Sequence, residues 1–189
     1  MLPNFNLSSG STVADLFLKK GVSTFHKAIE TIHNLPYGRV DNPTDIGNVI
    51  TQEKGTCSTK HATLKALAVE HGFNDIALTL AIYAMNGKNT SGINQVLDSY
   101  ELSYMLEAHC FLSYKEQIYD YTFPNSYTTE WRDSVIAQKT INADQIGSFK
   151  KEYHKQVIKE WVERDNLPYS KEQLWSIREE CIAVLTLPQ

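Results

Sequence analysis

The 189-residue chain has few cysteines and no long hydrophobic segment. No stretch approaches the roughly 18–20 consecutive apolar residues that cross a bilayer, so we expect no membrane partner. Residues 1–6 lack both the basic and the apolar region of a secretory signal, and we therefore expect a cytoplasmic protein. The 3 cysteines are an odd number in a chain without such a signal, which argues against a disulfide framework.

An excess of positive charge is also missing. The 18 Lys and Arg residues stand against 22 Asp and Glu, and the net charge of −4 argues against nucleic acid as a partner. There is no internal repeat and no low-complexity tract. An apolar content of 42% and a charged content of 21% are ordinary for a globular protein, so we expect a single domain over residues 1–189.

The sequence predicts helices first, then extended segments, and then helices again. Helical segments precede residue 51, and a strongly helical segment over 57–71 ends at Gly72. Extended patterns follow over 76–84, 105–114 and 117–123. Helices return over 150–164 and from Ser170, which forms a capping box with Gln173, to about residue 185. This order favours an α+β fold around an antiparallel sheet, with N- and C-terminal helices.

Cys57 stands where a reactive thiol is expected, at the start of the strongest predicted helix. Gly55 and Thr56 lead into it, and the dipole and backbone N–H groups of a helix N-terminus favour a thiolate. The same N–H groups are suited to binding an oxyanion. Cys57 is therefore the candidate nucleophile.

Two further residues come together if the extended segments pair through a two-residue turn at Lys115 and Glu116. That turn pairs Tyr114 with Gln117 and sets His109 and Asp120 on the same face, as diagonal neighbours about 7–8 Å apart. An odd-length turn would place Asp120 on the opposite face. His109 is thus the candidate base and Asp120 the acid that orients it.

These residues predict that the Cys57 thiolate attacks a carbonyl carbon, while His109 moves the proton and Asp120 orients the imidazole. Such chemistry requires no metal and no organic cofactor.

A family resemblance rests on three segments. The run from Gly55 to Ala62 is followed by Glu107-Ala108-His109-Cys110 and then by Asp120-Tyr121-Thr122. This pattern resembles the transglutaminase-like superfamily with its papain-like Cys-His-Asp core, in a bacterial-type form. Tyr37-Gly38-Arg39, upstream of Pro43, is similar to the run that precedes the nucleophile there. The resemblance covers residues 23–124 and implies an antiparallel sheet packed on the nucleophile helix. Residues 125–189 would be a helical extension. The resemblance further implies acyl transfer or hydrolysis through a thioester on Cys57, with a glutamine carboxamide or a peptide bond of a peptide or protein substrate as the acyl donor.

The resemblance also implies an oxyanion donor upstream of the cysteine. Animal transglutaminases use a tryptophan, but all three tryptophans here follow Asp120 in the sequence. Papain-like enzymes use a glutamine, so Gln52 is the first candidate and Asn48 the second. His61, one helical turn after Cys57, is a further site-lining candidate. Residues 86–92 and 125–148 are candidates for shaping the site.

Two other interpretations stay open. The fold could serve as a non-catalytic binding module, with Trp161 and Trp175 as anchors, although core packing is the expected use of both. A zinc site could be assembled from Cys57, His61, His109 and Cys110. The opposite-face placement of His109 and Cys110 and the lack of a Cys-x-x-Cys pair count against zinc. Cys110 and Cys181 are expected to belong to the core, and Glu107 to be a charge at a strand end and not a residue at the rim of the site.

Overall fold

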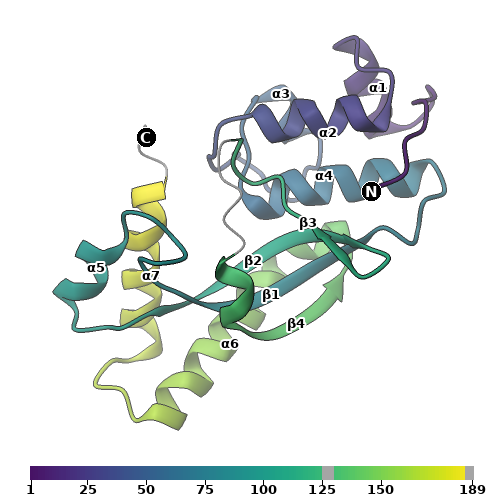
Figure 1. Ribbon diagram of the computed structural model, residues 1–189. Coiled ribbons are helices and arrows are strands. Elements are labelled where there is room, and N and C mark those ends of the chain that lie inside the picture. The colour runs from purple at the N-terminus through teal and green to yellow at the C-terminus, as the bar shows by residue number, and fades with distance from the viewer. Residues whose placement is uncertain (125–129, 186–189) are drawn as a thin grey trace. The chain divides into compact units, whose positions relative to one another are not determined.

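The computed structural model describes residues 1–124 and 130–185 and has an α+β architecture (Figure 1). In this part of the chain, one antiparallel sheet has the strand order β3-β2-β1-β4. The strands are β1 (Ala77–Met85), β2 (Met105–Tyr114), β3 (Gln117–Tyr119) and β4 (Val135–Ile141). The helices are α1 (Thr12–Lys19), α2 (Phe25–Asn34), α3 (Asn48–Thr51), α4 (Cys57–Glu70), α5 (Asn94–Ser99), α6 (Ser148–Asp165) and α7 (Lys171–Leu185), with 3-10 helices η1 (Glu130–Ser134) and η2 (Ala143–Ile146). None of the helices in these residues is long and apolar enough to cross a membrane.

The chain divides into two compact units. Of the described residues, the first unit comprises 1–80, 110–124 and 139–147, and the second comprises 81–109, 130–138 and 148–185. Each unit is assembled from three separate stretches, so residues far apart in the sequence meet within it. The expectation of one domain stays a prediction.

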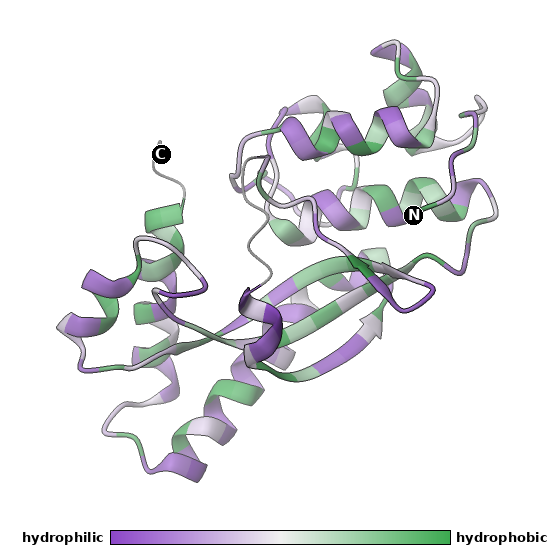
Figure 2. Ribbon diagram, in the orientation of Figure 1, coloured by the Kyte–Doolittle hydropathy of each residue, from purple (hydrophilic) through white to green (hydrophobic). Residues whose placement is uncertain are grey.

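Helix α4 is the centre of the first unit. Helices α1, α2, α3 and η2 all pack on it, and α2 runs beside it (Figure 1). Because neighbours surround it, α4 buries hydrophilic as well as hydrophobic residues, and the two kinds alternate along the helix (Figure 2). Glu70, at its C-terminal end, accepts hydrogen bonds from the backbone N–H groups of Val13 and Ala14, both at 3.0 Å. The end of α4 thereby caps the start of α1.

The hairpin of β2 and β3 has the register that the sequence predicts. Tyr114 pairs with Gln117 across a two-residue turn, and Leu112 pairs with Tyr119. Both turn residues, Lys115 and Glu116, have positive φ angles of 48° and 62°, as a type I′ turn requires. The expected length of the second strand is wrong, because β3 ends at Tyr119 and not at residue 123.

In the second unit, helix α7 is joined to β2 by a buried ion pair. Arg178 donates two hydrogen bonds of 2.6 Å to the carboxylate of Glu107. Burial alone would raise the pKa of Glu107, but the charge and hydrogen bonds of Arg178 hold that pKa at about 2. Beside this pair, the Nε2 atom of His154 on α6 donates to the carbonyl of Leu106 at 2.7 Å. Glu107 is therefore a structural residue, but it is buried in an ion pair and is not a solvated charge at a strand end.

The tryptophans of the C-terminal helices are packed in this unit. Trp161 is buried and stacks on Tyr104 with ring centroids 5.0 Å apart. Trp175 is half-buried between the ring of His154 and the cation of Arg178. Core packing therefore accounts for Trp161, which is not exposed as a docking anchor would be.

The expectation that the chain is mostly helical after residue 124 needs a correction. The capping box of Ser170 and Gln173 is confirmed by reciprocal hydrogen bonds of 2.8 and 3.2 Å at the start of α7. However, Val135–Ile141 forms strand β4 at one edge of the sheet. Its residues alternate between half-buried and exposed, and an edge strand of this kind needs few apolar residues. Residues 125–129 and 186–189 lie outside the described residues.

Candidate active site

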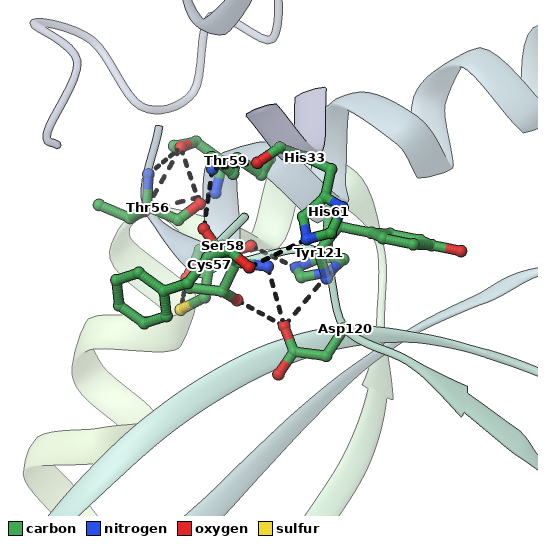
Figure 3. Close-up of polar contacts among 11 residues, drawn as sticks. His33, Thr56, Cys57, Ser58, Thr59, His61, Asp120 and Tyr121 are labelled. Carbon is green, nitrogen blue, oxygen red and sulfur yellow. Dashed lines mark hydrogen bonds and ion pairs between the residues drawn. The ribbon is translucent and has the colours of Figure 1, made fainter. Parts of the chain in front are cut away.

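Cys57 is the first residue of α4, as the sequence predicts. Thr56 is the N-cap, and its hydroxyl and that of Thr59 form a capping box (Figure 3). The backbone N–H of Thr59 donates to Thr56 Oγ1 at 3.4 Å, and the backbone N–H of Thr56 donates to Thr59 Oγ1 at 2.9 Å. The side chain of Cys57 is buried, with the residue 6% exposed, at the positive end of a 14-residue helix. This position favours the thiolate over the thiol.

A close backbone approach at Gly55 brings the chain to this helix start. Gly55 donates to the carbonyl of Pro36 at 3.1 Å and accepts from Gly38 at 3.3 Å, so the predicted Tyr37-Gly38-Arg39 run lies beside it. A Cβ atom at Gly55 would lie 2.8 Å from Lys60 Cγ. Glycine is therefore needed here because the Lys60 side chain passes directly over the backbone.

His61 connects Cys57 to the segment that carries Asp120. Its Nδ1 atom donates to the carbonyl of Cys57 at 2.7 Å, and its Nε2 atom accepts from the backbone N–H of Tyr121 at 2.8 Å (Figure 3). A backbone N–H can only donate, so the imidazole carries its proton on Nδ1. With both ring nitrogens engaged by the backbone, His61 is a connecting residue and not a base or a metal ligand.

Asp120 is the first residue after β3 and not a residue within a strand, which corrects the sequence expectation. Its Oδ1 atom accepts hydrogen bonds from the Thr122 backbone N–H at 3.1 Å and from the Thr122 hydroxyl at 2.6 Å. The same oxygen lies 3.7 Å from His61 Nε2. An Asx turn formed with Thr122 thus fixes one carboxylate oxygen of Asp120.

Lys60, which the sequence did not single out, is the buried cation of this site. It is fully buried, and its Nζ atom donates to the carbonyls of Leu35 at 2.6 Å and Thr122 at 2.8 Å. Burial lowers the pKa of Lys60 to about 8, and the charges of Asp120 and Cys57 oppose that decrease. The predicted nucleophile and the predicted acid therefore both act on the same ammonium group.

His109 lies on β2 in the second unit, among aromatic side chains. Its ring centroid is 4.7 Å from that of Trp131 and 6.2 Å from that of Tyr83, and the latter two rings pack on each other at 5.9 Å. Trp131 and Tyr83 are both buried, so they fix one side of the imidazole. Nothing in the local sequence pattern indicated either contact, because Trp131 is 22 residues from His109 in the sequence.

The loop over residues 86–92 is tied to the 3-10 helix that carries Trp131. The Asn89 amide donates to the carbonyl of Ala84 at 2.9 Å and to the hydroxyl of Ser134 at 3.1 Å. Ser134 in turn donates to the carbonyl of Trp131 at 2.8 Å. This loop therefore supports the aromatic surroundings of His109.

The two oxyanion candidates flank helix α3. Asn48 begins the helix, and its amide nitrogen donates to the carbonyl of Asn42 at 3.1 Å. Gln52 is the C-cap, and its amide oxygen accepts from the backbone N–H of Asp41 at 3.3 Å. Gln52 thus bonds to the protein through its amide oxygen, whereas Asn48 does so through its amide nitrogen. The bond of Asn48 therefore occupies an amide N–H, the group that an oxyanion donor would need, whereas the bond of Gln52 occupies its amide oxygen.

The other cysteines belong to the core. Cys110 and Cys181 are fully buried, and all three thiols are free of disulfides. Burial raises the pKa of Cys181 to about 11, which keeps it a protonated thiol. In residues 1–124 and 130–185, no group of three or more His, Cys, Asp and Glu side chains is arranged to hold a metal ion. The engaged nitrogens of His61 independently argue against the four-residue zinc site considered above.

The chain matches no protein-family model, and comparisons with curated proteins and with solved structures find no match either. A fold of this class hosts many activities, so the function is argued from the residues of the site.

Proposed function

We propose that this protein is a cysteine-dependent acyltransferase or hydrolase with a transglutaminase-like, papain-like core. Cys57 is the nucleophile, His109 the general base and acid, and Asp120 the residue that orients the imidazole. The substrate is a peptide-type amide, either a glutamine carboxamide or a peptide bond. A reduced thiol nucleophile of this kind fits a cytoplasmic location.

The observation that carries the proposal is the joint placement of Cys57 and Asp120 around α4. Cys57 begins the helix, and the segment that follows Asp120 is bonded to Lys60 and His61, one turn further along the same helix. Nucleophile and acid are thus held by one rigid element. The register of β2 and β3, on which the assignment of His109 depends, is the predicted one over its three pairs.

The reaction follows from these roles. His109 takes the proton of the Cys57 thiol, and the thiolate adds to the amide carbonyl carbon. The negative charge moves to the carbonyl oxygen, which the positive end of α4 stabilises, with Gln52 as the proposed further donor. The C–N bond then breaks, and the nitrogen leaves as ammonia or an amine with a proton from His109. Water or a second amine attacks the thioester, gives its proton to His109 and releases the thiolate. Neither metal nor cofactor enters these steps.

One observation favours a second candidate function, a transglutaminase-like binding module without catalysis. Cys57 is buried, with only 6% of the residue exposed, whereas a substrate must reach its sulfur for catalysis. A module of this type would retain the helix start and the Asp120 turn as structural features only.

Site-resolved alkylation distinguishes the two functions. Native protein is treated with iodoacetamide between pH 6 and 9, and the modified cysteines are assigned by mass spectrometry in the wild type and in His109→Ala. If the protein is an enzyme, Cys57 should be alkylated selectively at a pH where an ordinary thiol, with a pKa of about 8.5, is mostly protonated. The enzymatic function also predicts that Cys57 loses this faster alkylation in His109→Ala.

Cys110 and Cys181 are the internal controls of this experiment, because both are buried in the core. If Cys57 reacts no faster than these two, or only after unfolding, the binding module is the correct function. If it reacts selectively, glutamine-containing peptides with and without an added amine separate transfer from hydrolysis.

A further inference from the structure

The segment that follows β3 is held by side chains instead of by a strand partner. The Tyr121 N–H donates to His61, and the carbonyl of Thr122 accepts from Lys60. The carbonyl of Phe123 accepts from Nε2 of His33 at 2.9 Å. Three basic side chains from α2 and α4 therefore satisfy successive main-chain groups of residues 121–123, where a sheet would otherwise supply the partners.

Lys60 differs from the other two because it carries a full charge in a buried position. Its Nζ atom is surrounded by the carbonyls of Leu35 and Thr122, with that of His33 at 3.5 Å. Neutral carbonyls satisfy the hydrogens of an ammonium group but do not neutralise its charge, and burying a charge is costly. The groups that act on it electrostatically with a favourable sign are Asp120 and Cys57. The charge is thus positioned where a carboxylate and a thiolate would benefit from it.

We propose that Lys60 is a positioning residue of the Cys57 site, whose ammonium fixes the turn bearing Asp120 against α4 and favours the thiolate of Cys57. The inference rests on the proposed function and extends it to a residue that does not touch the substrate. It also explains Gly55, since the path of the Lys60 side chain requires a residue without a Cβ atom there.

The chain provides a matched control on the same helix. Lys65 also donates its hydrogens to two backbone carbonyls, those of Ile76 at 2.6 Å and Asn74 at 3.1 Å. Burial lowers the pKa of Lys65 too, but the charge acting on it is that of Asp75. Lys65 therefore performs the same structural task as Lys60 without facing the site.

The experiment compares Lys60→Met with Lys65→Met. For each folded variant, the rate of Cys57 alkylation by iodoacetamide is measured across pH 6–9, together with the free energy of unfolding in urea. We expect Lys60→Met to slow alkylation at pH 7 about tenfold or more and to shift the profile to higher pH, as a change of one unit or more in the thiol's pKa would do. Lys65→Met should leave both the rate and the profile within about twofold of the wild type.

Equal effects of the two substitutions on the alkylation profile would overturn the inference. If Lys60→Met does not fold, Lys60→Gln keeps a donor for the carbonyls without the charge. Slow alkylation in Lys60→Gln then supports the role of the charge, and a wild-type profile refutes it. Failure of the proposed function is recognised separately, because in that case wild-type Cys57 already shows no selective reactivity.

Discussion

The backbone N–H of Tyr121 donates a 2.8 Å hydrogen bond to Nε2 of His61, whose Nδ1 atom donates at 2.7 Å to the carbonyl of Cys57. One imidazole thus joins the residue after Asp120 to the first residue of the nucleophile helix. Because both partners are backbone groups, the connection fixes the main chain on both sides of the candidate site.

His61→Phe should destabilise the fold and weaken the site together. The substitution leaves a part-buried donor at Tyr121 and a buried acceptor at Cys57 with one partner fewer, so we expect the free energy of unfolding to fall by about 2–4 kcal/mol. Urea unfolding at pH 7.5 measures this change. His26→Phe is the control, since half-buried His26 makes one such bond, of 2.9 Å to the carbonyl of Leu2, and should cost about 1 kcal/mol. Similar losses in both variants would contradict the connecting role.

Removal of Arg178 should have a larger effect than removal of its half-buried partner Glu179. Arg178→Met leaves the buried carboxylate of Glu107 uncompensated, and we expect a loss of about 3–5 kcal/mol. Glu179→Gln breaks a 2.6 Å ion pair with the same guanidinium, but the Glu179 side chain is 34% exposed, so the substitution should cost only about 1 kcal/mol. In a double-mutant cycle, Glu107→Met should recover much of the stability lost in Arg178→Met. No recovery in the double variant would argue against the buried pair.

Stability should fall on mild acidification because of His154. Burial lowers the pKa of His154 to about 4, against an ordinary value of 6.5, so the unfolded state binds the proton more readily than the folded state between these values. The free energy of unfolding should therefore be highest above pH 6.5 and decrease by about 3 kcal/mol as the pH falls to 4. Glu107, whose pKa of about 2 is lowered from 4.5, adds a further loss of the same sign below pH 4.5.

Urea titrations at pH 4.5, 5.5, 6.5 and 7.5 measure this dependence. His154→Gln is the matched variant, since glutamine can donate to the carbonyl of Leu106 but does not titrate. Its stability should change little between pH 6.5 and 4.5. A wild-type slope in this variant would assign the acid sensitivity to other groups.

Gly55→Ala should disturb the start of α4, whereas Gly38→Ala should be tolerated. A Cβ atom at Gly55 would lie 2.8 Å from Lys60 Cγ and 3.1 Å from Thr59 Oγ1, and we expect a loss of about 1–3 kcal/mol from this overpacking. At Gly38, in the adjoining segment, the nearest atom would be Lys54 Cδ at 3.4 Å, an ordinary contact with an expected effect within about 0.5 kcal/mol. Thermal or urea unfolding of the two variants tests the difference, and equal stabilities would contradict it.

Much of the fold was predictable because its strongest patterns are local. The start of α4 at Cys57 follows from Gly55 and Thr56, and the start of α7 follows from the capping box of Ser170 and Gln173. The register of β2 and β3 follows from hydrophobic alternation, even though Lys115 and Glu116 are unusual residues for two positions of positive φ.

The features that were missed depend on contacts between distant segments. Strand β3 stops at Tyr119 because side chains from α2 and α4 take the next main-chain groups, and local alternation carries no information about them. Strand β4 lies at an edge, and Gln138 and Lys139 separate its apolar residues, so it lacks the continuous alternation that would indicate a strand. The burial of Lys60 could not be predicted either, since lysine is among the least buried residue types.

The attachment of residues 121–123 to three basic side chains has an evolutionary consequence. The position of Asp120 depends on His33, Lys60 and His61, whereas the pairing of the sheet depends on the strands. Substitution at these positions would therefore displace Asp120 without breaking the pairing of the strands, at a cost in stability such as that expected for His61→Phe. A lineage could in this way convert an enzyme into a binding protein, or restore the enzyme, through a few changes on two helices and without rebuilding the sheet.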